Sequence, residues 1–167
     1  MDGEHRLRSA TAADAPFLFD MLMEAVNWHP EQQLSRSTVS ADPALARYID
    51  GWPRPSDLGV LAEAAGGPIG AAWLRVFTGD DPGYGYIADD VPELSMAVAA
   101  AWRGCGVGRA LLQEIGDRAR SAGHRAISLS VERANFAHRL YISEGYHVVE
   151  RGAASDTMVK ELPPTSR

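Results

Sequence analysis

The sequence predicts a single α/β domain, an α+β mixed sheet on which about four helices pack. Two kinds of segment are interspersed along the chain. In one kind apolar residues alternate, as is typical of strands, and in the other they recur at helical spacing. The length of 167 residues also suits one domain with a core of its own. We expect this domain to cover residues 1–162 and to leave residues 163–167 as a C-terminal tail.

The amino-terminal part begins with a strand and a helix. Apolar residues recur at helical spacing after Thr11, and Pro16 falls early enough for a first helical turn. From Asn27 to Ser40 the chain is polar and aperiodic, and Trp28-His29-Pro30 should prevent a helix there. The expected elements are a strand at 5–9, helices at 12–26 and 43–51, and antiparallel strands at 58–66 and 68–78 with a Gly66-Gly67-Pro68 turn.

The carboxy-terminal part opens with a loop at 78–92 that is rich in glycine and aspartate. In the strand that follows, Leu94, Met96 and Val98 share one face, because side chains alternate along a strand. A glycine-rich turn then leads into an amphipathic helix that ends at Gly123. The expected elements are strands at 93–99, 125–131, 146–150 and 156–162, and a further helix at 134–145.

Charge and cysteine content argue against several classes of protein. The net charge of −6, with Lys160 as the single lysine, disfavours a general nucleic-acid binder. No apolar run approaches the ~20 residues that span a bilayer, and no signal peptide is recognisable, so we expect a cytoplasmic protein without membrane contact. One cysteine, Cys105, permits no internal disulfide, and no metal site is expected.

The segment WRGCGVGRALL, residues 102–112, places three glycines before a helix. Glycine allows the backbone to approach a ligand closely, and a helix start offers unpaired N–H groups that attract anions such as phosphate. A P-loop is excluded because Gly108 is followed by Arg109 and Ala110 instead of lysine and a hydroxyl residue. A dinucleotide site fits poorly, because the glycine spacing is one residue short.

The arrangement Arg103-x-x-Gly106-x-Gly108 after a strand resembles the GNAT superfamily of acyl-CoA-dependent N-acetyltransferases, whose motif is Arg/Gln-x-x-Gly-x-Gly/Ala. Val98, five residues before the arginine, matches as well, whereas Ala100 departs from the proline of many members. The segment LSVERANFAHRLYISEGYHVV is similar to a second family motif. Its matching residues are Leu129, Val131, Asn135, Ala137, Tyr141, Gly145 and Tyr146.

The resemblance implies the GNAT fold, a sheet splayed at its centre, and acetyl-CoA as the acyl donor. Backbone N–H groups from Arg103 to Arg109 would hold the diphosphate, and pantetheine would lie between the strands at 93–99 and 126–131. Asn135 would bind pantetheine or cap the next helix, and the two roles are compatible. The implied cofactor-binding residues are Met96, Val98, Arg103, Gly104, Gly106, Val107, Gly108, Arg109, Asn135 and Arg139.

The resemblance also implies direct attack of an amine on the thioester. Tyr141 is the candidate acid for the leaving thiolate, although a packed aromatic residue would give the same pattern. Glu93 is the candidate base, with a solvated carboxylate at a strand end as the alternative. His29, His138 and Tyr84 are lesser candidates for the base. Cys105 is expected to be a small packing residue and not a nucleophile.

The acceptor is expected to be a small cationic amine or a peptide amine. The loop at 78–92 carries four aspartates, which suit a cation, and Trp28, Tyr84 and Tyr86 are the candidate acceptor-binding residues. Trp28, Trp52 and Tyr86 could also form a homodimer surface, which is compatible with either function. The alternative function is a non-catalytic acyl-CoA-binding module. The presence of both Tyr141 and Glu93 favours the enzyme.

Overall fold

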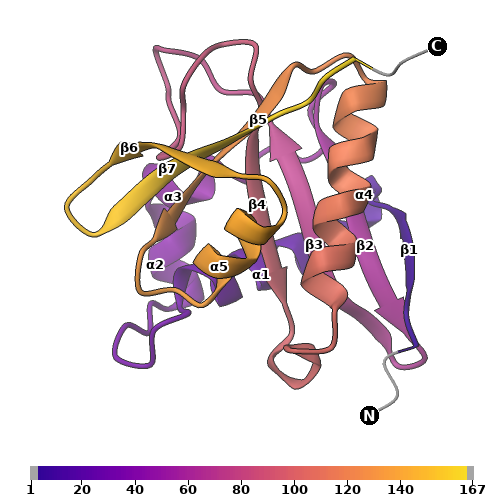
Figure 1. Cartoon of the computed structure of the whole chain (residues 1–167). Coiled ribbons are helices and arrows are strands. Elements are labelled where there is room, and N and C mark those ends of the chain that lie inside the picture. The colour runs from indigo at the N-terminus through magenta and orange to yellow at the C-terminus, as the bar shows by residue number, and fades with distance from the viewer. Residues whose placement is uncertain (1–3, 165–167) are drawn as a thin grey trace.

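The computed structural model describes residues 4–164 and contains one seven-stranded sheet with the order β1-β2-β3-β4-β5-β7-β6 (Figure 1). The first three residues of the chain and the last three of the expected tail lie outside the described part. The strands are β1 (Arg6–Ser9), β2 (Leu58–Ala64), β3 (Gly67–Arg75), β4 (Glu93–Val98), β5 (Ala126–Glu132), β6 (His147–Arg151) and β7 (Ser155–Glu161). The helices are α1 (Ala15–Val26), α2 (Arg36–Ala41), α3 (Pro43–Ala46), α4 (Val107–Ser121) and α5 (Ala137–Ser143), with 3₁₀ turns at Ala12–Asp14 and Ala100–Trp102.

Helices cover both faces of the sheet, with α4 on one side and α1 on the other (Figure 1). Residues of β3 show how alternation divides the core, because Ala72 and Leu74 pack with α4 while Ala71 and Trp73 pack with α1. The predicted α/β fold with a mixed sheet is therefore confirmed.

The helix α2 lies where the sequence was expected to be irregular, so that expectation was wrong. Ser35 caps it, because its hydroxyl accepts a hydrogen bond from the Thr38 N–H at 3.2 Å. Val39 is fully buried against α1 and β3 residues and supplies the apolar contact that a six-residue helix needs. One capping serine and one apolar residue are too few to produce a visible periodicity.

The strands β4 and β5 separate almost as soon as they meet. Six residue pairs join β3 to β4, whereas Glu93 and Ser128 form the single pair between β4 and β5 among residues 4–164. The Ser128 N–H donates to the Pro92 carbonyl at 3.0 Å. Because backbone groups alternate between the two edges of a strand, the N–H groups of Met96 and Val98 face the gap beyond this pair.

A buried ion pair fastens the segment after α3 to the sheet. The guanidinium of Arg75 on β3 makes two hydrogen bonds to the carboxylate of Asp57, at 3.1 and 2.7 Å, and both side chains are almost inaccessible to solvent. Arg75 also donates to the carbonyls of Arg47 and Asp50 at 2.8 and 2.7 Å. This contact determines where the intervening residue Tyr48 lies.

Replacement of Asp57 by alanine should destabilise the fold strongly, because it leaves the Arg75 charge buried without a counter-charge. We expect the free energy of unfolding to fall by about 3–5 kcal/mol in a urea titration. The matched control is Asp20→Ala, which breaks an exposed pair with Arg36. That variant should lose less than about 1 kcal/mol, and equal losses would contradict the structural role of Arg75.

Candidate active site

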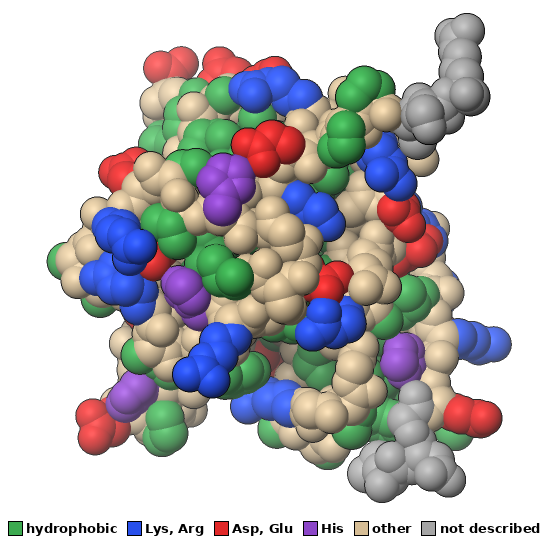
Figure 2. All heavy atoms as spheres, in the orientation of Figure 1, with side chains coloured by type: hydrophobic (Ala, Val, Ile, Leu, Met, Phe, Trp, Pro, Cys, Tyr) green, Lys and Arg blue, Asp and Glu red, His purple; other side chains and the backbone are tan. Residues whose placement is uncertain are grey.

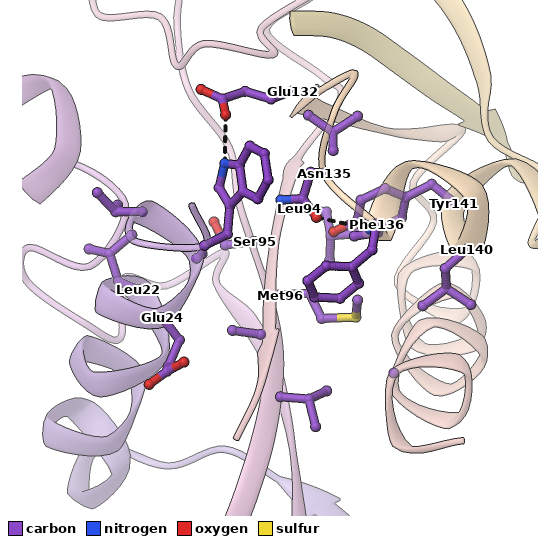
Figure 3. A pocket seen from close by; sticks show the side chains of 18 of the residues that line it. Leu22, Glu24, Leu94, Ser95, Met96, Glu132, Asn135, Phe136, Leu140 and Tyr141 are labelled. Atoms are coloured by element: carbon purple, nitrogen blue, oxygen red, sulfur yellow. Dashed lines mark hydrogen bonds between the residues drawn. The ribbon is translucent and has the colours of Figure 1, made fainter. Parts of the chain in front are cut away.

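A cleft of about 780 Å³ opens where β4 and β5 diverge. Its walls come from α1, β4, the glycine-rich turn, the end of β5 and α5. Figure 3 shows Glu24 on α1 at one side of β4, and Phe136 and Tyr141 at the other side. The cleft therefore runs along the edge of β4 that lacks a neighbouring strand.

The glycine-rich turn forms the end of the cleft beside α4. Gly104 and Gly106 have φ angles of 76° and 85°, in the left-handed region where a side chain would be strained. Gly108 is constrained by packing instead, because an added Cβ would lie 3.1 Å from the Leu140 side chain. The first backbone bond of α4 joins the Ala110 N–H to the Gly106 carbonyl, so the N–H groups of residues 107–109 have no partner within the helix. The turn can thus receive an anion such as a diphosphate.

The three arginines expected near phosphate differ in their surroundings. Arg103 lines the cleft, donates to the Glu24 carboxylate at 2.9 Å and lies over the Phe136 ring. Arg109 also lines the cleft and pairs with Glu144. Arg139 is exposed and lies outside the lining of the cleft. Basic side chains gather on this face around α5 and the start of α4 (Figure 2).

Glu93 is the first residue of β4, and its carboxylate is buried in the wall of the cleft. The Tyr48 hydroxyl donates to its Oε2 at 2.5 Å, while Oε1 has no hydrogen-bond partner among the described residues. Burial raises the pKa of Glu93 to about 7, and the hydrogen bond from Tyr48 opposes that rise. The carboxylate can therefore accept a proton near neutral pH.

Tyr141 reaches the cleft from α5, as Figure 3 shows. It is 7% exposed, and its hydroxyl makes no hydrogen bond to a described residue. Its ring packs edge-on against Tyr146 with the centroids 5.7 Å apart. Burial raises the pKa of the phenol, so the group stays protonated and can act as a proton donor.

Asn135 lies in the turn before α5 and also lines the cleft. Its Oδ1 accepts the Ala137 N–H at 2.9 Å, which steadies the start of the helix. The amide nitrogen makes no hydrogen bond within residues 4–164 and is free to meet a ligand.

Only two of the three expected acceptor-binding residues line the cleft. Trp28 and Tyr84 line the cleft, and the Trp28 indole donates to Glu132 at the end of β5 across 2.6 Å (Figure 3). Tyr86 lies outside the lining and bonds to Asp89 through its hydroxyl. Trp52, expected at a dimer surface, donates to the Thr11 carbonyl at 3.1 Å.

The loop aspartates that suggested a cationic acceptor lie outside the cleft lining. Asp81 pairs with Arg47, and Asp90 pairs with Arg125. The carboxylates that do line the cleft belong to three residues that are distant in sequence: Glu24, Glu93 and Glu132.

Sequence reasoning did not single out Glu24, Glu132 and Phe136, which also line the cleft, or the contact of Tyr48 with Glu93. Phe136 directly follows the motif residue Asn135 and could have been found from that position. Tyr48 and Glu24 carry no local signal, because their partners Glu93 and Arg103 lie far along the chain.

Of the three lesser candidates for the base, Tyr84 lines the cleft and the two histidines do not. His138 bonds to the buried carboxylate of Asp156 at 3.1 Å, and His29 accepts the Glu31 N–H at 3.1 Å. Cys105 packs against the core cluster around α4.

Two further observations concern the described residues as a whole. No group of three or more His, Cys, Asp or Glu side chains within residues 4–164 is arranged to hold a metal ion. None of the helices in that range has the length and apolarity needed to cross a membrane.

Comparison with solved structures supports the same fold. A ribosomal-protein-alanine N-acetyltransferase from Brucella melitensis is 26% identical, with a TM-score of 0.66 over 94% of this chain and 99% of its own. A GCN5-related N-acetyltransferase from Kribbella flavida is 27% identical, with a TM-score of 0.65 over 95% and 98%. A phosphinothricin acetyltransferase from Sinorhizobium meliloti, solved with AcCoA, is 21% identical, with a TM-score of 0.69 over 99% and 94%.

A search of curated protein sequences found no match. The family model described as Acetyltransferase (GNAT) family matches residues 22–146, three quarters of the chain and the whole of the cleft's β4 wall and glycine-rich turn. This chain belongs to the GNAT acetyltransferase family.

Proposed function

We propose that the protein transfers an acetyl group from acetyl-CoA to an amine. The observation that carries the proposal is one cleft that combines an anion-binding turn, a strand edge without a neighbour, a buried carboxylate and a phenol. Two solved relatives of the same fold contain coenzyme A or AcCoA, and two relatives that are more than 25% identical are N-acetyltransferases.

The donor would bind along the free edge of β4. The N–H groups at the start of α4 would hold its diphosphate, with Arg103 and Arg109 nearby. The N–H groups of Met96 and Val98 face the gap and would bond pantetheine or the acetyl carbonyl. A donor at that carbonyl stabilises the oxyanion that forms during attack.

The transfer needs the acceptor nitrogen to lose two protons and the sulfur to gain one. The ammonium gives the first proton to Glu93, whose Oε1 has no partner among the described residues, and attacks the acetyl carbon as a neutral amine. As the carbon–sulfur bond breaks, the thiolate takes the Tyr141 proton, and the second proton of the nitrogen restores the phenol. The products are the acetylated amine and free coenzyme A.

The acceptor would be a cationic amine. The support comes from residues that line the cleft and not from the aspartates of the loop at 78–92. Glu93 and Glu132 line the cleft beyond the glycine-rich turn, beside the aromatic rings of Trp28 and Tyr84. Carboxylates and aromatic faces together favour an ammonium group over a neutral alcohol.

An acceptor screen tests the proposal. Purified protein is incubated with acetyl-CoA and a panel of polyamines, amino acids, peptides and neutral alcohols, while free thiol is measured. Thiol release with amines alone supports the assignment. Binding of acetyl-CoA in calorimetry without any turnover would favour the non-catalytic acyl-CoA-binding module instead.

Tyr141→Phe should lower kcat by about 100-fold, because the leaving thiolate loses its proton donor. The Kd for acetyl-CoA should stay within about twofold, since the ring remains in place. Steady-state kinetics and calorimetry check the two values. An unchanged kcat would assign Tyr141 to packing alone.

The pH profile of kcat/KM should report Glu93. The pKa of this carboxyl is raised to about 7, so the ionised, active form is lost as the pH falls below that value. The wild-type rate should therefore decline about tenfold per unit below pH 6 and level off above pH 8. Glu93→Gln should lower the plateau by about 100-fold and remove this limb. A limb that persists in the variant would identify another base.

Glu132→Gln should raise the KM for a cationic acceptor by about fivefold, the effect of one exposed ion pair. The amide still accepts the Trp28 hydrogen bond, so kcat should change little. The matched control is Glu150→Gln on β6, an exposed residue outside the cleft, which should leave KM unchanged. Equal effects in both variants would point to the overall charge of the protein instead.

A further inference from the structure

We infer that Tyr48 is a positioning residue for Glu93: it holds one carboxylate oxygen in the wall of the cleft and leaves the other without a hydrogen bond. The inference rests on the proposed function, in which Glu93 receives the acceptor's proton. Tyr48 lies in the turn after α3, 45 residues from Glu93, and both residues line the cleft.

The direction of the hydrogen bonds at the Tyr48 hydroxyl is determined by its two neighbours. The backbone N–H of Tyr84 lies 2.8 Å from the hydroxyl oxygen and can only donate to it. The hydroxyl proton is therefore directed to the second neighbour, Glu93 Oε2, at 2.5 Å. The Tyr48 hydroxyl thus favours the ionised carboxylate and engages only one of its oxygens.

The Tyr48 ring and backbone are held firmly enough to position another residue. The Trp73 indole donates to the Tyr48 carbonyl at 2.9 Å, and Arg75 donates to the carbonyl of the preceding residue. The ring meets Phe77 edge-on at 5.2 Å and stacks on Tyr84 at 6.5 Å. Both contacts depend on the ring and not on the hydroxyl.

The second carboxylate oxygen is enclosed but unpaired. An added Cβ on Gly83 would lie 2.2 Å from Glu93 Oε1, so the loop backbone packs directly on this atom. From β5, the Ser128 hydroxyl is likewise buried and has no partner among the described residues. Arg47 is the one cation that acts on the pKa of Glu93, and it lowers that pKa only weakly beside burial. The Tyr48 hydroxyl lowers the Glu93 pKa most, and the backbone of Gly85 lowers it less.

The Tyr48 ring packs in the core, whereas the Tyr48 hydroxyl alone binds Glu93, so the two roles can be tested separately. Its own pKa is raised by burial and by Glu93, so it remains a phenol and a donor. Loss of the hydroxyl alone should leave the ring contacts in place and raise the pKa of Glu93 further, by about one unit. At pH 7 the ionised fraction would fall about fivefold, and at pH 9 it would recover.

The test compares Tyr48→Phe with the wild type by NMR of protein carrying ¹³C-labelled glutamate, in which the Glu93 carboxyl is titrated without any substrate. The matched control is Tyr146→Phe, which removes another buried tyrosine hydroxyl, one that has no hydrogen-bond partner among residues 4–164. We expect the Glu93 pKa to rise by about one unit in Tyr48→Phe alone. An unchanged pKa in Tyr48→Phe, or an equal rise in both variants, would overturn the inference.

A second measurement needs no variant. In the wild type, the Tyr48 hydroxyl proton should be protected from exchange with solvent and should shift as Glu93 titrates. A hydroxyl that exchanges freely and does not respond would overturn the inference. Where turnover is found, the acid limb of kcat/KM in Tyr48→Phe should move to higher pH with the plateau retained. Neither NMR measurement needs acetyl-CoA or an acceptor. The role of Tyr48 can therefore be tested even if the proposed reaction is not found.

Discussion

The structure depends on the early separation of β4 and β5, which share only the pair of Glu93 and Ser128. If β4 paired with β5 along its whole length, the backbone N–H and C=O groups on that edge of β4 would all be engaged in hydrogen bonds between the strands. Separation leaves the N–H groups of Met96 and Val98 available and creates the cleft beside them. Because Glu93 sits at the last paired position, its carboxylate is buried by the sheet and still borders the cleft.

The buried carboxylates of Asp57 and Glu93 differ in how their negative charge is compensated. Asp57 is compensated by two hydrogen bonds from a guanidinium, so it serves to hold the chain in place. Among the described residues, Glu93 has a neutral partner on one carboxylate oxygen and none on the other, so its charge is costly and the carboxylate regains a proton easily. The same segment, residues 47–57, connects the two, since Arg75 anchors the backbone that carries Tyr48. A stable ion pair thus supports a reactive carboxylate.

Local sequence patterns predicted those features that arise from neighbouring residues. The glycine-rich turn, the following helix, the strand carrying Glu93 and the turn at Asn135 all lie within short motifs. What remained hidden depends on contacts between distant segments. Tyr48 meets Glu93 across 45 residues, and Trp28 meets Glu132 across 104 residues. Composition also does not reveal the partners of the loop aspartates, of which Asp81 pairs with Arg47 and Asp90 with Arg125.

The loop Gly83-Tyr84-Gly85 has a consequence for engineering. Both glycines are pressed against fixed atoms, since an added Cβ would lie 2.2 Å from Glu93 and 2.5 Å from the Leu129 backbone. The Tyr84 side chain between them is 61% exposed, although its ring stacks on Tyr48 and its backbone N–H donates to the Tyr48 hydroxyl. Position 84 therefore suits exchange among aromatic side chains, while its neighbours must remain glycine. A library of aromatic residues at that position would vary the shape of the cleft rim and keep the ring contact with Tyr48.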